Sequence, residues 1–164
     1  MKKLITVIVV LAAMIAMSGV AQGGSGKAKK TVFKATLSGA NEVPPVETDT
    51  TGEAEFVVRR NSIDFELEID DAEDVFGAAG AHIHCAPAGE NGPVVAFLAG
   101  AVAGGFDGSV EVEATLTAAN ITDPACGTDI AGLAQSMRRG RTYVNVHSTA
   151  HPAGVIRGQI VRSR

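Results

Sequence analysis

The four histidines of this 164-residue chain fall in two short clusters, and their type and spacing could support metal chemistry. His82 and His84 flank Ile83, and His147 and His151 belong to a later segment. In an extended strand, side chains at positions i and i+2 leave from the same face, so His82 and His84 can point at one ion. Neutral imidazole is a common ligand of zinc and copper, and three such ligands make a usable site. The sequence therefore predicts a copper or zinc site at His82, His84 and His147, provided that the two clusters fold together.

The residues around the second cluster differ in what they could contribute. His151 is the weaker candidate ligand, because a spacing of four residues converges only on a helix and Pro152 favours a loop. Asn145 and Tyr143 would share the face of His147 in a strand, where Asn145 could hold a metal ligand in position from behind. The competing interpretation is structural: the histidines bond loop backbone at strand ends and hold no ion.

The N-terminal segment has the layout of a secretory signal peptide. Lys2 and Lys3 precede an uncharged run over 4–17, and small residues follow it up to Ala21. We expect residues 1–21 to be removed and the product to be exported, to the periplasm or outside the cell. The apolar run is shorter than the roughly 20 residues that cross a bilayer, so no integral membrane segment is expected after cleavage.

Length and charge bound the mature protein. Removing residues 1–21 leaves 143 residues, which suits one domain over 32–162 behind a flexible leader at 22–31. Two lysines leave with the signal, so 12 basic residues face 18 acidic ones and the formal charge moves from -4 to -6. This balance argues against nucleic acid as a partner.

Cys85 and Cys126 are the two cysteines of the chain. In a protein bound for an oxidising compartment, an even count favours a disulfide. The alternative is that Cys85 acts as a thiolate ligand beside His84, but adjacent residues of a strand face opposite sides. The sequence therefore predicts a Cys85–Cys126 disulfide.

Alternating polarity predicts a mostly β protein. We expect strands at 32–38, 52–59, 62–69, 79–85, 94–98, 109–117, 142–147 and 155–161. Arg60 and Asn61 suit a tight hairpin turn, and the acidic pairs over 70–74 are expected in a polar turn after the third strand. Apolar residues at three- and four-residue steps predict one short helix near 129–139, with Thr128 as a possible N-cap and Gly140 as its stop. The expected fold class is an all-β antiparallel β-sandwich.

Four phrases, in this order and spacing, resemble the CHRD domain family. They are Leu-Ser-Gly-Ala-Asn-Glu-Val-Pro-Pro at 37–45, Ala-His-Ile-His at 81–84, Asn-Gly-Pro-Val-Val at 91–95, and Tyr-Val-Asn-Val-His at 143–147 with Ala-Gly-Val-Ile-Arg-Gly-Gln at 153–159. The resemblance covers about residues 32–162 and implies an extracellular β-rich domain. The family is named for repeats in chordin, an extracellular binder of bone morphogenetic proteins. Val155 stands where the family usually has a glutamate, so any ion pair or ligand role of that acid is absent.

A more distant likeness concerns the copper ligands of copper-zinc superoxide dismutases, which are also antiparallel sandwiches of Greek-key type, as immunoglobulin domains are. A strand-borne His-x-His followed much later by segment 140–147 is similar to their pattern, and it implies His82, His84 and His147 around one metal. The chain has no histidine between Cys85 and Cys126, so the bridging and zinc-site histidines of those enzymes have no counterpart.

Three functions from different classes follow from these observations. The first is an exported domain that binds copper or zinc through the histidines. The second is an extracellular protein-interaction or adhesion module, as the resemblance to chordin implies, with structural histidines and no metal. The third is a mononuclear copper metalloenzyme, so whether the chain is an enzyme stays open, and no catalytic residue is assigned.

Overall fold

The computed structural model describes residues 30–163, so the expected signal peptide and most of the leader lie outside the described residues. Nine strands, three short 3-10 helices and one α-helix follow one another along this part of the chain. The strands are β1 (Thr31–Ser38), β2 (Thr51–Val58), β3 (Ile63–Val75), β4 (Ala81–Cys85), β5 (Val94–Ala99), β6 (Phe106–Leu116), β7 (Thr142–Val146), β8 (Ile156–Gln159) and β9 (Val161–Arg162). The helices are η1 (Gly39–Asn41), η2 (Ala118–Asn120), η3 (Pro124–Cys126) and α1 (Ile130–Arg138).

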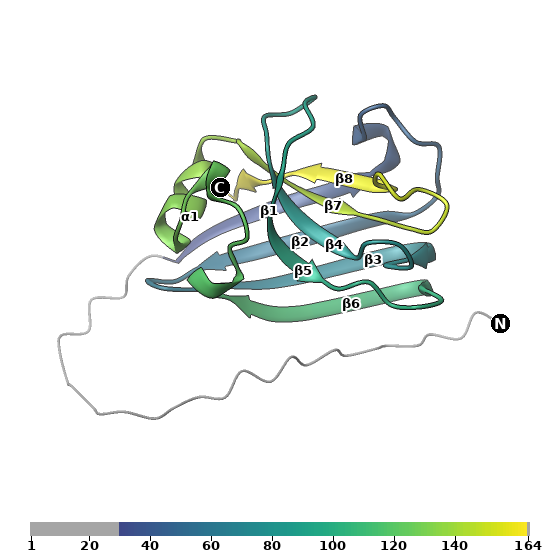
Figure 1. Cartoon of the computed structure of the whole chain (residues 1–164), viewed down its shortest axis with the longest axis horizontal. Coiled ribbons are helices and arrows are strands. Elements are labelled where there is room, and N and C mark those ends of the chain that lie inside the picture. The colour runs from purple at the N-terminus through teal and green to yellow at the C-terminus, as the bar shows by residue number, and fades with distance from the viewer. Residues whose placement is uncertain (1–29, 164) are drawn as a thin grey trace.

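All strand pairs are antiparallel, and the strands form one continuous sheet in the order β5-β4-β7-β8-β1-β2-β3-β6, with β9 paired to β1. The sheet curls over itself, so that its two ends, β5 and β6, come into contact (Figure 1). The expected all-β antiparallel class with one short helix is confirmed. The two layers of the sandwich are halves of a single, nearly closed sheet.

The long β2–β3 hairpin shows how the sequence builds the core. The Arg59 N–H donates to the Ser62 carbonyl, which closes the expected tight turn. Inward-facing residues alternate along β3 and pack against the other half of the sheet, because every second side chain of a strand leaves from the same face. The most deeply buried apolar residues of this core include Phe33, Leu37, Phe56, Ile63, Leu67, Ile69, Ile83, Val144 and Ile156.

Strand β3 is longer than the polarity pattern indicates. The acidic pairs over 70–74 belong to the strand, and the expectation of a polar turn there is wrong. The β3–β6 register shifts between Ile69 and Ala72 and again between Ala72 and Val75, and Asp71 and Asp74 adopt positive φ angles at these irregularities. Aspartate tolerates such backbone angles better than most residues, so the polar segment can stay paired with β6.

Helix α1 lies where the apolar periodicity predicts it. Its N-cap is Asp129 and not Thr128, since the Asp129 carboxylate accepts the Gly132 N–H at 2.7 Å. Gly140, at φ 64°, follows the helix end in the left-handed region that glycine tolerates. None of the helices in the described part of the chain is long and apolar enough to cross a membrane.

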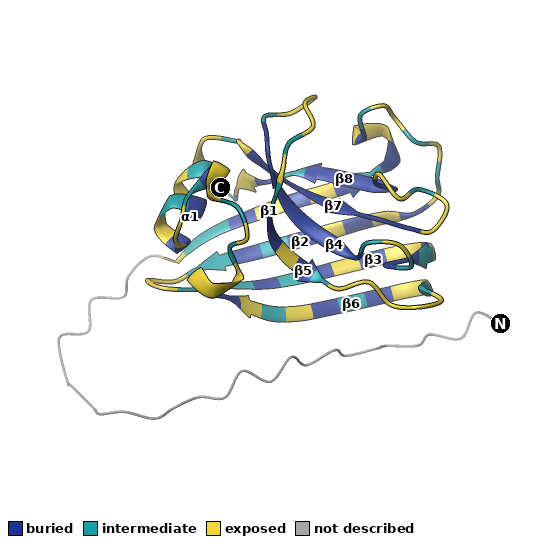
Figure 2. Cartoon of the chain, viewed as in Figure 1, coloured by how far each residue is buried: buried dark blue, intermediate teal, exposed yellow. Residues whose placement is uncertain are grey.

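The outer faces of the two halves of the sheet differ in character. On the outer face of β2, β3 and β6, two rows of three glutamates stand partly or fully exposed. They are Glu53, Glu68 and Glu111 in one row and Glu55, Glu66 and Glu113 in the other. Both faces of β4 and β7 are buried, as is β8 except for Gln159, and these strands are largely dark blue in Figure 2. Polar side chains on the outer face of β4, β7 and β8 are therefore enclosed beneath loops.

Candidate metal centre

Strands β4 and β7 place the histidines on this enclosed face. Ala81, Ile83 and Cys85 alternate toward the core, so His82 and His84 face outward. In the β4–β7 register His82 lies opposite Asn145 and His84 opposite Tyr143. His147 follows directly after β7, where its N–H donates to the Gly80 carbonyl. Antiparallel pairing therefore brings the two histidine clusters together across neighbouring strands.

The three histidines form a close buried cluster. His82, His84 and His147 are 4%, 8% and 6% exposed, and one ring nitrogen from each lies within 4.8 Å of the other two. His82 Nδ1 and His147 Nε2 are 3.1 Å apart. Two nitrogens bound to one ion at about 2 Å would be separated by roughly 3.3–3.5 Å, so small side-chain adjustments would bring all three nitrogens onto one ion.

Backbone carbonyls fix the orientation of two of the rings. His84 Nδ1 lies 2.9 Å from the Gly92 carbonyl oxygen, and His147 Nδ1 lies 3.0 Å from that of Pro152. A carbonyl can only accept, so each neutral ring carries its proton on Nδ1 and leaves the Nε2 lone pair free. This arrangement is how proteins hold imidazole ligands ready for a metal ion.

The remaining ring nitrogens follow from these tautomers. The His147 Nε2 lone pair accepts from His82 Nδ1–H, and this hydrogen bond joins the two neighbouring strands. His84 Nε2 is buried and has no hydrogen-bond partner among the described residues. Buried polar atoms without a partner are uncommon and costly, and a lone pair in this state beside two other imidazoles is suited to donate to an ion.

Burial keeps the cluster neutral. Burial is the main cause that lowers the pKa of His82 to about 4, the neighbouring rings of His147 and His84 act in the same direction, and the Ala79 backbone acts in the opposite one. The pKa values of His84 and His147 are also lowered, mainly by burial, with the Gly92 and Pro152 carbonyls acting in the opposite sense. Neutral imidazole is the form that can bind metal, and lowered pKa values favour this form at neutral pH.

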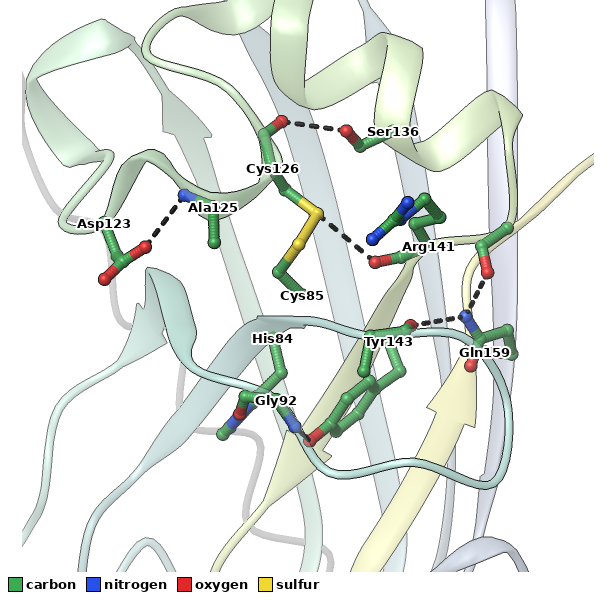
Figure 3. Close-up of a disulfide and its surroundings, with 12 residues drawn as sticks. His84, Cys85, Gly92, Asp123, Ala125, Cys126, Ser136, Arg141, Tyr143 and Gln159 are labelled. Atoms are coloured by element: carbon green, nitrogen blue, oxygen red, sulfur yellow. Dashed lines mark hydrogen bonds between the residues drawn. A yellow bond between two sulfur atoms is a disulfide. The ribbon is translucent and has the colours of Figure 1, made fainter.

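Tyr143 and Arg157 support His84 from one side. The Tyr143 ring stacks on His84 with centroids 4.9 Å apart and planes at 14°, and its hydroxyl accepts the Gly92 N–H at 3.2 Å (Figure 3). The Arg157 guanidinium lies over the Tyr143 ring, 3.4 Å from the ring centroid. Arg157 is 2% exposed and donates to Asn91 Oδ1 and to the Glu90 carbonyl. Tyr143 and Arg157 thus pack in one column beside His84.

Asn145 lies in the same polar layer, next to a buried carboxyl. Its Nδ2 donates to the Ala153 carbonyl, while its Oδ1 has no partner among the described residues. A Cβ on Gly154 would lie 2.6 Å from Glu42 Oε1 and 2.6 Å from Asn145 Nδ2, so both side chains pack on this glycine. Burial raises the pKa of Glu42 to about 7, although the charge of Arg157 and the Val43 backbone lower it.

Glu42 and Arg157 are the polar residues of this layer that we did not single out as site residues from the sequence. Both lie within the phrases that carry the family resemblance, at 37–45 and 153–159. That signal marked the segments but could not indicate that the two side chains are buried in one layer.

His151 is not part of the histidine cluster in the described structure. It is half-buried in the turn after β7, where its N–H donates to Ser148 Oγ and its carbonyl accepts from Gly154. The structure thus brings together the three stronger candidates and leaves the weaker one outside.

The Cys85–Cys126 disulfide is present, with the two Cα atoms 5.6 Å apart, and ties the end of β4 to η3 (Figure 3). Ser136 Oγ donates to the Cys126 carbonyl, so the bridge also anchors α1. Cys85 faces the core while His84 faces the polar layer, which excludes a thiolate ligand at this position.

The family model of the CHRD domain matches residues 33–160, nearly the whole described domain. The chain belongs to the CHRD domain family. The histidine cluster, Tyr143, Arg157 and the disulfide all lie within the matched range of this CHRD domain. No curated protein and no solved structure matches the chain.

Proposed function

We propose that this CHRD domain binds one transition-metal ion, copper or zinc, through His82, His84 and His147. The observation that carries the proposal is the convergence of three buried neutral imidazoles, with His84 Nε2 lacking any partner among the described residues. Buried histidines with a purely structural role most often use both ring nitrogens for hydrogen bonds. Here carbonyls hold the Nδ1 atoms of His84 and His147, and one ring nitrogen of each of the three histidines lies within 4.8 Å of the other two.

The donor set suits these metals. Imidazole nitrogens bind zinc and copper, whereas calcium and magnesium prefer oxygen ligands. His82 presents Nδ1 to the cluster, so binding an ion there would move the Nδ1 proton to Nε2 or release it. The enclosing loops would then shield the ion from water.

Metal titration of the purified oxidised protein tests the proposal. We expect one equivalent of Zn²⁺ or copper to bind per chain and the uptake to disappear in His84→Ala. His151→Ala is the matched control, because it removes an imidazole outside the cluster, and it should bind as the wild type does. Unsaturable uptake, or uptake that survives His84→Ala, would leave the histidines structural and favour an interaction module.

We also propose that the protein is exported. CHRD domains belong typically to secreted proteins, and the Cys85–Cys126 disulfide suits an oxidising compartment. Mass spectrometry of the mature protein should find an N-terminus near residue 22, and an intact N-terminus on protein retained in the cytoplasm would contradict export.

A further inference from the structure

We infer that the histidine site selects monovalent copper, Cu⁺, over the divalent ions Zn²⁺ and Cu²⁺. The inference rests on the proposed metal site and adds the charge of the ion that the site favours. Three observations carry it. The candidate ligands are uncharged, and the buried guanidinium of Arg157 is separated from His84 by the Tyr143 ring. In the described structure, no fourth side-chain ligand completes the cluster.

The ligand set supplies no negative charge. Of the two groups of potential metal ligands in the described residues, the buried one consists of His82, His84 and His147 alone. The cost of moving an ion out of water grows with the square of its charge in a continuum picture, so a divalent ion loses about four times as much hydration as a monovalent ion of the same size. Neutral imidazoles offset the smaller cost more readily than the larger one.

Arg157 adds a fixed positive charge to the site. Its guanidinium stacks on the Tyr143 ring, and the Tyr143 ring in turn stacks on the His84 ring. The structure places no carboxylate within ion-pair distance of Arg157 among the described residues; its donors contact an amide and backbone carbonyls. Because Coulomb repulsion is proportional to the charge of the ion, Arg157 opposes a divalent ion twice as strongly as a monovalent one.

Glu42 is the buried acid that could offset this charge. It packs on Gly154 beside Asn145, and its Oε1 has no hydrogen-bond partner in the described structure. Burial raises its pKa to about 7, so at neutral pH the carboxyl is only partly ionised. It therefore neutralises Arg157 only in part.

Coordination number points in the same direction. Zinc in proteins takes four ligands and Cu²⁺ favours tetragonal geometry, whereas a d¹⁰ monovalent ion needs no more than three donors. The cluster offers three nitrogens, and its side chains are at most 8% exposed, which leaves little room for added water ligands. Charge and coordination thus favour the same ion.

Competition titrations of the full oxidised protein at pH 7 test the inference. Cu⁺ would be kept reduced with ascorbate under nitrogen and measured against a colorimetric Cu⁺ chelator, and Zn²⁺ and Cu²⁺ against chelators of known affinity. We expect the dissociation constant of Cu⁺ to be at least tenfold below those of both divalent ions. Tighter binding of Zn²⁺ or Cu²⁺ at the same histidines overturns the inference and leaves the proposed function standing, whereas no His84-dependent binding of any ion refutes both.

Arg157→Gln tests the electrostatic cause. At roughly 10 Å and an effective dielectric constant near 20, removing one charge should strengthen binding by about tenfold per unit of ion charge. The divalent ions should therefore gain about tenfold more than Cu⁺ does. Glu42→Gln, which removes the partial negative charge, should shift the preference further toward Cu⁺, and it gives a second reading if Arg157→Gln does not fold. Equal changes for all three ions in a folded variant would refute the role of charge.

Discussion

The pH dependence of the free energy of unfolding tests the protonation states of His82 and Glu42, whose buried side chains have pKa values shifted in opposite directions. His82 has its pKa lowered from 6.5 to about 4, so the native state resists protonation while the unfolded chain accepts it. Stability is therefore lost as the pH falls through the window from 6.5 to 4, by up to about 3 kcal/mol at 1.36 kcal/mol per pKa unit. Glu42 has its pKa raised from 4.5 to about 7, so its contribution is fully present below 4.5 and is lost as the pH rises through 7, again by up to about 3 kcal/mol.

These contributions largely cancel in the wild type, and single substitutions should separate them. We expect Glu42→Gln to lose stability more steeply than the wild type between pH 7.5 and 4.5, and His82→Asn to lose it less steeply. Asparagine can still donate toward His147 Nε2 but does not titrate, so the comparison isolates the proton. His84 and His147, whose pKa values are also lowered, add to the loss on acidification in every form.

The assay is urea unfolding with a chelator present, repeated at four pH values, with His151→Asn as the matched control. The quantity compared is the change in unfolding free energy with pH, which removes the constant cost of each substitution. If Glu42→Gln and His82→Asn both follow the wild-type pH dependence, these side chains are not held in the protonation states that we assign to them.

Two further predictions concern packing around the site. Gly154→Ala should destabilise the fold by about 2–4 kcal/mol in urea unfolding, because Gly154 has φ 136° and a Cβ would collide with Asn145 and Glu42. The control is Gly89→Ala, which has a φ of 81° but open space around it and should cost only about 1 kcal/mol. Equal costs for the two substitutions would contradict the collision. Phe97 is 51% exposed, and its ring packs edge-on against His82 with the ring centroids 4.5 Å apart. Phe97→Ala should therefore speed metal release several-fold in stopped-flow chelation, while the free energy of unfolding changes by under about 1 kcal/mol. An unchanged release rate would show that Phe97 does not cover the site.

Much of the fold follows from the sequence because period-two polarity reports burial directly. The alternation through Ile63 and Ile69 located β3, and all eight expected strands have a counterpart in the structure. The extension of β3 to Val75 was missed, since bulges break the alternation on which the prediction depends. The last expected strand is divided at Ile160, where β8, paired mainly with β7, ends and β9, paired with β1, begins.

The histidines of the candidate site could be singled out from the sequence, and their surroundings could not. The i, i+2 rule identified His82 and His84 from local geometry alone, but their meeting with His147 depends on β4 pairing with β7, some 60 residues later. The burial of Arg157 and Glu42 depends on loops packing over the sheet, and long-range contacts of that kind leave no periodic signature. Charged residues are rarely buried, so composition favours the wrong environment for both.

Because His84 and Cys85 are adjacent on β4, the proposed metal site and a cysteine sulfur lie next to each other in the sequence and must be kept apart. Free thiols are the ligands that soft metal ions prefer, and a thiol within reach of the ion would compete with the imidazoles or be oxidised by bound copper. The pleat of β4 turns Cys85 into the core and His84 to the opposite face, with the strand backbone between them. Even when reduced, the sulfur could reach an ion held by the histidines only if the strand twisted out of its ladder. The imidazole and the sulfur therefore belong to adjacent residues but lie on opposite faces of the sheet, and the sheet backbone keeps them apart.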